Sequence, residues 1–350
     1  MQSDLRDIIW LQTAFIGDVV LTSGAIELAA RSFPGVRQHV ISTAAGCEVL
    51  KGSPFLVERI PFAKRESFWP ALKEVKKRLQ KARVKADTAV ILQVHRSLRS
   101  SLLSRYLGIR TITYDETVFG FLADKRVKRD RSVHEAVRVA SLLSALGVSA
   151  SEINSVRPVL QALPLRSEIP WQKEFSEFSG KCVALAVGSQ WGTKRWPLES
   201  YLELAERLFS IPDLAIALMG SSEERALTDV LARTLQEKFP TRTLWNLAGQ
   251  TSFDDLRRVF PKLNLIVSND SSPVHFASAF NVPTLAIFGP TVPAFGFGPL
   301  SDKHAIAEHL NLPCRPCSDH GPQVCPLGHF KCMKELSVQT VFEKALKLLG

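Results

Sequence analysis

The sequence has no long uninterrupted apolar run. None of its 350 residues belongs to a stretch of about 18 consecutive apolar residues, the length that a membrane-spanning helix needs. The first residues, MQSDLRDIIWLQ, place acids ahead of the apolar run and lack the basic region of a secretion signal. Together these two absences predict a cytoplasmic protein.

Two common nucleotide-binding motifs are also missing. The first apolar run is not followed by GxGxxG, and GxxxxGK[ST] occurs nowhere, which argues against a dinucleotide dehydrogenase and a P-loop NTPase. Tyrosine occurs only three times, and no aromatic platform for stacked bases stands among the basic residues. A nucleic-acid-binding protein is therefore only a remote alternative.

Cysteine is scarce over most of the chain and crowded near its end. Two of the six cysteines, Cys47 and Cys182, are isolated and are expected to be buried as small apolar residues. The other four are spaced C-x2-C-x7-C-x6-C: Cys314, Cys317, Cys325 and Cys332. A structural metal, a disulfide and reduced thiols each remain open for this group, and we predict reduced thiols with no bound metal.

The formal net charge of +10 lies entirely in the first half of the chain. Residues 1–170 hold 26 basic and 16 acidic residues, whereas residues 171–350 hold 18 of each. Such a surplus suits nucleic acid, an anionic membrane or a phosphorylated substrate. An ordinary solvated helix face explains the basic run KEVKKRLQKARVK (73–85) equally well.

Apolar strands alternate with amphipathic helices twice along the chain. We predict strands at 7–13, 37–43, 88–94, 181–187, 214–220, 263–269 and 283–289. Helices are predicted at 17–31, 68–83, 132–146, 198–209, 222–237, 252–260, 272–280 and 337–348. The proline-rich stretch 157–175 is predicted to be a linker. The pattern indicates an α/β protein with two doubly wound parallel-sheet domains.

Asp18 is an isolated carboxylate in LQTAFIGDVVLTSGAIELAA (11–30). It stands where the first predicted strand gives way to a helix, so it is either a helix cap or a catalytic group. The start of a helix lowers the pKa of a carboxyl group, whereas apolar neighbours raise it. The balance depends on how deeply Asp18 is buried.

Polar loops follow three strands of the second half, where open α/β sheets bind their ligands. VGSQWGTKRWP (187–197) offers hydroxyls from Ser189 and Thr193 and a charge from Lys194, which suits a diphosphate. In LMGSSEERA (218–226), Glu223 or Glu224 is either a ribose acceptor or a helix cap.

The third stretch, VSNDSSPVHFASAFNVPTLAIFGPT (267–291), packs four polar residues between a strand and a helix: Asn269, Asp270, Ser271 and Ser272. The backbone N–H groups of Ser271 and Ser272 are expected to bind an anion there, with His275 on the first turn, because helix N-termini attract negative charge. A simple N-cap would account for only one of them.

IGDVVLTSGA, TKRWP and SNDSSPVHFASAFNVPTLAIFGPT together resemble the ADP-heptose lipopolysaccharide heptosyltransferases, glycosyltransferase family 9. The tail LPCRPCSDHGPQVCPLGHFKCM is similar to that of the heptosyltransferase II branch. The resemblance implies a GT-B fold, in which two Rossmann-like domains face each other across a cleft. It also implies inverting transfer of heptose from ADP-L-glycero-β-D-manno-heptose to the lipopolysaccharide inner core.

By position, the resemblance makes Asp18 the general base and places Lys194 at the donor phosphates. Asp270, Ser271, Ser272 and His275 fall in its donor-binding region, although Ser272 stands where the family usually has glycine. No metal cofactor is implied, because a lysine and helix N-termini can neutralise the leaving diphosphate.

The basic first half would then meet a phosphorylated Kdo–lipid A acceptor at the inner face of the inner membrane, and Arg65, Arg96 and Arg99 are the candidates for this contact. We expect an acceptor domain at 1–165, a nucleotide-sugar domain at 166–335, and a C-terminal helix at 336–350 that packs back on the first domain. Another GT-B transferase or a sugar-nucleotide epimerase is the main alternative.

Overall fold

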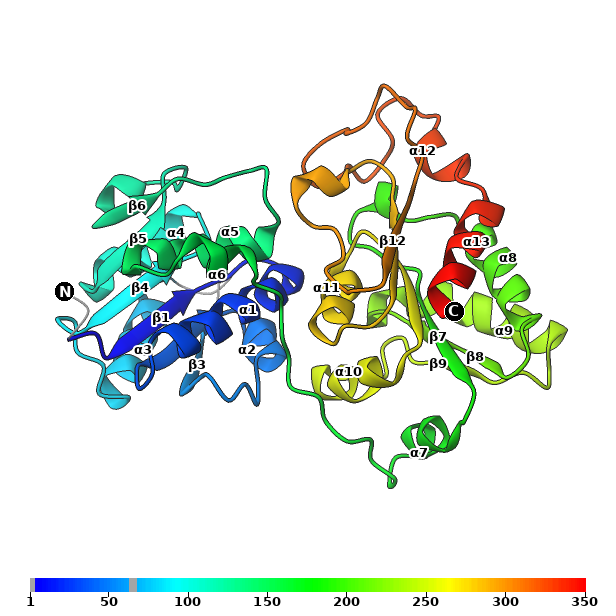
Figure 1. Ribbon diagram of the computed structural model, residues 1–350, viewed down its shortest axis with the longest axis horizontal. Coiled ribbons are helices and arrows are strands. Elements are labelled where there is room, and N and C mark those ends of the chain that lie inside the picture. Colours follow the sequence, from blue (N-terminus) through cyan, green and yellow to red (C-terminus); the bar gives the residue numbers. More distant parts are fainter. Residues whose placement is uncertain (1–3, 63–67) are drawn as a thin grey trace. The chain divides into compact units, whose positions relative to one another are not determined.

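The computed structural model describes residues 4–62 and 68–350 and divides the chain into two units, Met1–Gln161 and Ala162–Gly350. Each unit is built on one six-stranded sheet whose paired strands are all parallel (Figure 1). This confirms the predicted doubly wound α/β fold.

The first sheet has the strand order β3-β2-β1-β4-β5-β6. Its strands are β1 (Asp7–Leu11), β2 (Arg37–Ser42), β3 (Glu58–Pro61), β4 (Ala89–Gln93), β5 (Arg110–Tyr114) and β6 (Lys125–Val127). Its α-helices are α1 (Ile16–Ser32), α2 (Ala44–Val49), α3 (Phe68–Lys81), α4 (Leu98–Leu107), α5 (Glu135–Ser141) and α6 (Ala150–Asn154), with 3₁₀ turns η1 (Gly120–Leu122) and η2 (Leu142–Leu146).

The second sheet, in the order β12-β11-β10-β7-β8-β9, repeats the same topology. Its strands are β7 (Lys181–Ala186), β8 (Leu214–Met219), β9 (Leu244–Asn246), β10 (Leu265–Asn269), β11 (Thr284–Phe288) and β12 (His304–Glu308). Its α-helices are α7 (Pro170–Glu177), α8 (Leu198–Phe209), α9 (Arg225–Lys238), α10 (Phe253–Val259), α11 (Ser272–Ala279), α12 (Lys331–Lys334) and α13 (Val338–Leu349). Its 3₁₀ turns are η3 (Gly192–Lys194), η4 (Ser222–Glu224), η5 (Phe260–Lys262) and η6 (Pro293–Phe295).

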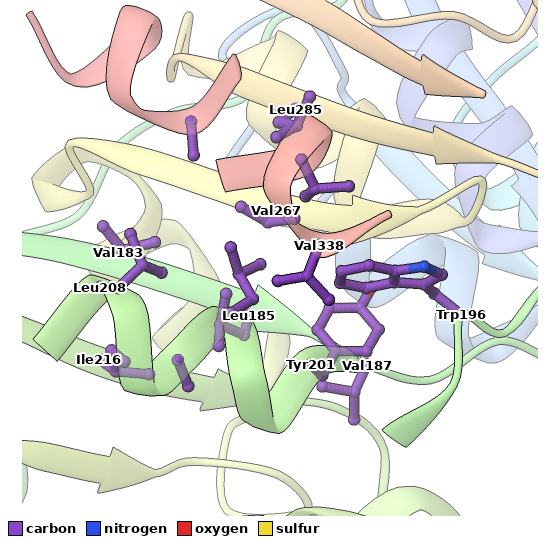
Figure 2. Close-up of a cluster of buried hydrophobic side chains, with 14 of the residues drawn as sticks. Val183, Leu185, Val187, Trp196, Tyr201, Leu208, Ile216, Val267, Leu285 and Val338 are labelled. Atoms are coloured by element: carbon purple, nitrogen blue, oxygen red, sulfur yellow. The ribbon is translucent and has the colours of Figure 1, made fainter. Parts of the chain in front are cut away.

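Both sheets are buried on both faces, which explains why their central strands are apolar runs rather than alternating sequences. On one face of the first sheet, α3 and α4 share a core with β1 and β4. In the second unit, Trp196 and Tyr201 lie side by side in the core, with ring centroids 5.1 Å apart (Figure 2).

Three expectations need correction. The stretch 157–175 is not linker throughout, because Pro170 starts α7 at its first turn. The helix expected at 132–146 begins at Glu135, and its second half is the tighter turn η2. The C-terminal helix α13, expected as an element separate from the second domain, packs against α8 and β12 of the second unit, because Val338, Val341 and Ala345 complete the apolar core there.

Candidate functional site

Each sheet reverses its strand order between two central strands, β1 and β4 in the first and β7 and β10 in the second. Ligands of open α/β sheets bind at such switch points, outside the carboxyl ends of the strands. In this chain each switch point is bridged by a buried or half-buried polar group.

In the first unit, Thr13 and His95 connect the segments that follow β1 and β4. The Thr13 hydroxyl lies 2.8 Å from Nδ1 of His95. The same ring nitrogen is 3.2 Å from the Ser97 hydroxyl and 3.3 Å from that of Ser100. These contacts fix the loop that carries the chain from β1 toward Asp18.

Asp18 is the third residue of α1, not its N-cap, which is Phe15. Its carboxyl group accepts hydrogen bonds from the backbone N–H groups of Phe15 and of Asp18 itself. The N-cap interpretation of Asp18 is therefore wrong: its carboxyl group lies in the first turn and reaches back to the N-cap residue.

Burial raises the pKa of Asp18 from 3.8 to about 7, although part of the side chain remains accessible to solvent. This value of about 7 includes a raising contribution to the pKa from the negative charge of Glu135 and lowering contributions from the two backbone hydrogen bonds and the charge of Arg129. Burial thus outweighs the start of the helix. A carboxyl group with a pKa near 7 is well suited to accept a proton at neutral pH.

Glu135, at the start of α5, is held between two arginines. Its carboxylate lies 3.0 Å from Nη2 of Arg129 and 2.9 Å from Nη1 of Arg138. All three side chains are at least nine-tenths buried. The sequence analysis missed this group, since Glu135 and Asp18 are 117 residues apart and only the packing of α5 on α1 brings them close.

Arg96 lies in a cationic cluster around Glu116. That carboxylate is 3.1 Å from Arg96 and 3.0 Å from Arg131, and Arg129 approaches it to 3.8 Å. Three guanidinium groups around one carboxylate leave an excess of positive charge. Arg99 lies on α4, and its guanidinium is 5.6 Å from the Phe68 ring centroid. Arg65, the third candidate acceptor contact, lies outside the described residues.

In the second unit, Asn269 bridges the switch point between β7 and β10. Its side-chain amide donates to the carbonyls of Val187 (2.9 Å) and Gly188 (3.1 Å). Its oxygen accepts from the Trp196 backbone N–H at 3.0 Å and from the Tyr201 hydroxyl at 3.1 Å. One fully buried amide therefore determines the shape of the loop that carries Ser189, Thr193 and Lys194.

Lys194 forms an ion pair with Asp270 across the switch point. Its Nζ lies 2.7 Å from Oδ2 of Asp270, and both side chains are largely buried. Thr291, which follows β11, donates to the same oxygen at 2.6 Å. The structure thus joins residues from two predicted loops, while Thr291 is a third member that the sequence analysis did not single out.

Ser271 is the N-cap of α11, and Ser272 is the first residue of that helix. His275 is buried on the next turn, with its ring centroid 6.1 Å from that of Phe297. The N-terminus of α11 follows directly on Asp270, so its positive end lies beside the Lys194–Asp270 pair. The charges of the pair balance each other, and the helix N-terminus favours a ligand that carries negative charge.

Glu224 contacts the same region from η4. Its carboxylate accepts the backbone N–H of Ser221 at 2.8 Å, which gives it a capping role. It also lies against Gly188, where a Cβ would come within 1.8 Å of its Oε1. A larger residue at 188 would therefore displace the Glu224 carboxylate from this position. The Glu223 side chain is exposed, and the hydrogen bond from Ser221 lowers its pKa.

The cysteine-rich segment braces the η3 loop. The backbone N–H and the hydroxyl of Thr193 both donate to the carbonyl of Pro322. The Gly192 N–H donates to the Gln323 side chain at 3.0 Å, and that side chain donates back to the carbonyl of Gln190 at 3.1 Å. We call residues 315–323 the strap. The sequence analysis did not foresee this support.

All six cysteines are unpaired. Among residues 4–62 and 68–350, no group of three or more His, Cys, Asp and Glu side chains is arranged to hold a metal ion. Within the same ranges, no helix combines the length and the apolar composition needed to cross a bilayer.

The family model for glycosyltransferase family 9 (heptosyltransferase) matches residues 74–327, more than half of the chain. Lipooligosaccharide heptosyltransferase 2 of Campylobacter jejuni is 29% identical over 56% of the chain, a match that spans only 60% of that relative's length. Lipopolysaccharide heptosyltransferase 2 of Salmonella typhimurium is 27% identical over 96% of this chain and 97% of its own. The solved E. coli ADP-heptose LPS heptosyltransferase II superposes with a TM-score of 0.78, at 22% identity over 98% of both chains.

Proposed function

The chain belongs to glycosyltransferase family 9, the heptosyltransferases, and on that premise we propose that it moves heptose from ADP-L-glycero-β-D-manno-heptose to the lipopolysaccharide inner core. The observation that carries the proposal is the buried Lys194–Asp270 pair beside the N-terminus of α11, at the switch point of the second sheet. A lysine and a helix N-terminus are the groups that a leaving diphosphate requires.

Donor binding is assigned to the second unit. Lys194 and the first backbone N–H groups of α11 face the diphosphate. Hydroxyl groups for donor binding come from Ser189, Thr193, Ser271 and Ser272. The remaining donor-binding residues are Asp270 and His275. Glu223 and Glu224 bind the ribose. Ser272 carries a Cβ in place of the usual glycine, and its partial exposure leaves room for it at the ligand.

Acceptor binding is assigned to the first unit, where Asp18 is the general base. A carbon–oxygen bond forms between the acceptor hydroxyl and the anomeric carbon as the bond to the donor phosphate breaks. The hydroxyl proton passes to Asp18, and ADP leaves with the bonding electron pair. Displacement from the opposite side inverts the anomeric configuration. Arg65, Arg96 and Arg99 attract the phosphorylated acceptor.

We propose that this chain adds the second heptose of the inner core. It would act at the cytoplasmic face of the inner membrane, on a Kdo–lipid A type glycolipid. The similarity to heptosyltransferase 2 enzymes supports this finer assignment.

The decisive experiment is a transfer assay with ADP-heptose and two acceptors, Kdo–lipid A with and without a first heptose. We expect ADP release and an acceptor mass increase of one heptose only with the mono-heptosylated acceptor. Equal transfer to the unheptosylated acceptor would contradict the assignment of the second heptose. Conversion of the donor without any acceptor would instead favour an epimerase.

A further inference from the structure

Most of the large apolar side chains exposed on the first unit belong to three neighbouring segments: the start of α3, the outer side of α4, and the turn η1. We call them the apolar belt: Trp69, Leu98, Leu102, Val118, Phe119, Phe121 and Leu122. Trp69 is 66% and Phe121 70% exposed. A cluster of exposed apolar side chains of this size usually marks an interaction site.

Hydrogen bonds and ring contacts join the three segments into one surface. The Ser101 hydroxyl of α4 donates to the carbonyl of Val118 at 2.6 Å, which ties η1 to α4. The Phe119 and Phe121 rings pack with centroids 5.4 Å apart. Arg99 of α4 covers the ring of Phe68, which itself packs on Trp69 at 5.7 Å, and this ties α3 to α4.

Basic side chains flank the belt. Helix α3 carries five basic residues and one acid, and α4 carries two basic residues and no acid. Lys76 of α3 lies 5.2 Å from the ring centroid of Tyr106 on α4, so the basic side of α3 adjoins α4. Beyond η1 follow Lys125, Arg126 and Lys128, all exposed.

We propose that the apolar belt and its basic flank form a docking surface for an anionic lipid bilayer. Aromatic side chains enter the interfacial region of a bilayer, and neighbouring lysines attract its anionic headgroups. Stable peripheral binding takes two such signals together, and this surface has both. Binding to nucleic acid would account for the basic residues, but it would not account for the exposed aliphatic side chains of α4.

The apolar belt lies at the same edge of the first sheet as the proposed general base. Leu98 follows β4 and Val118 follows β5, so the belt borders the carboxyl edge of the first sheet, where Asp18 follows β1. This step rests on the proposed function: a glycolipid acceptor would present its sugars to the base from the membrane in which it is anchored.

The test is flotation with vesicles of phosphatidylethanolamine and phosphatidylglycerol, using the full chain. The double variant W69S/F121S should bind at least about tenfold more weakly than wild type. The matched control V230S/L310S removes two apolar side chains that are 55% and 78% exposed in the second unit, and it should bind as wild type does.

The charge is tested separately. Reversal of two lysines of α3 in K73E/K77E should also reduce binding about tenfold or more, since basic residues near an anionic surface attract its headgroups. K303E/K347E makes the same change in exposed residues of the second unit and should have little effect. Replacing phosphatidylglycerol by phosphatidylcholine should weaken wild-type binding to the level of K73E/K77E.

Wild-type binding that W69S/F121S does not reduce would overturn the proposal, as would the absence of any binding to anionic vesicles. Tight binding to DNA that K73E/K77E abolishes, without vesicle binding, would assign the surface to nucleic acid instead. W69S/F121S should still transfer heptose to a deacylated, water-soluble acceptor. If wild type binds vesicles through the belt but transfers no heptose, the proposed function fails and the docking surface stands.

Discussion

Replacing Asp18 with asparagine should make the protein more stable and less active. The raised pKa of Asp18, about 7 against 3.8, means that ionising this carboxyl group costs the folded protein about 4 kcal/mol. The folded protein holds the proton up to about pH 7, whereas the unfolded chain releases it near pH 4. Stability conferred by the neutral form is therefore lost as the pH rises through this interval.

Asparagine has no proton to lose, so the variant escapes this cost. Between pH 5 and pH 8 the difference in unfolding free energy between D18N and wild type should grow by about 2.5 kcal/mol in favour of the variant. Urea denaturation at the two pH values measures it. The figure is an upper value, because the side chain keeps part of its solvent contact.

The same substitution should lower kcat/KM by about 10²- to 10⁴-fold, the usual contribution of a general base. Wild-type kcat/KM should rise with pH up to about pH 7 and then level off, and the residual activity of D18N should lack that rise. E27Q removes a carboxylate from the same helix and is the matched control. Near-normal turnover by D18N, or a stability difference that does not change with pH, would refute the reasoning.

Three further predictions concern the two sites and the cysteines. E135Q removes a negative charge that raises the pKa of Asp18, so the acid limb of the pH–rate profile should move to lower pH, and an unmoved limb would contradict that influence. K194A should lower kcat by about 10²- to 10³-fold, as loss of one transition-state donor does, while the exposed control K238A should not; an effect confined to acceptor KM would exclude a donor-side role. Thiol titration in denaturant should find six free cysteines, and elemental analysis of protein purified without chelator should find no stoichiometric zinc or iron; either metal in equimolar amount would contradict the free-thiol assignment.

The central strands could be predicted from the sequence because burial on both faces demands continuous apolar runs. Strands β1, β2, β4, β7, β8, β10 and β11 were all predicted to within two residues at either end. Edge strands such as β6 (KRV) and β9 (LWN) are short and half-exposed, so their sequences carry no comparable signal.

The polar loops were located from their composition, but their support could not be. Asn269 stood at the end of a predicted strand, yet its bonds to Val187 and Trp196 depend on the pairing of β7 with β10. The influence of Glu135 on Asp18 likewise depends on how α5 packs against α1. Local sequence shows which side chains are available, and tertiary packing decides which of them meet.

The strap has a consequence for how the chain matures during synthesis. Thr193 is held by Pro322, which the ribosome adds 129 residues later. A nascent chain that already contains all of β7 to β11 still lacks the brace for its η3 loop, and α13, which completes the core, comes later still. The second unit can therefore reach its final form only after α13 has been synthesised, and a chain that ends at residue 320 would lack both the bracing residues Pro322 and Gln323 and the closing helix.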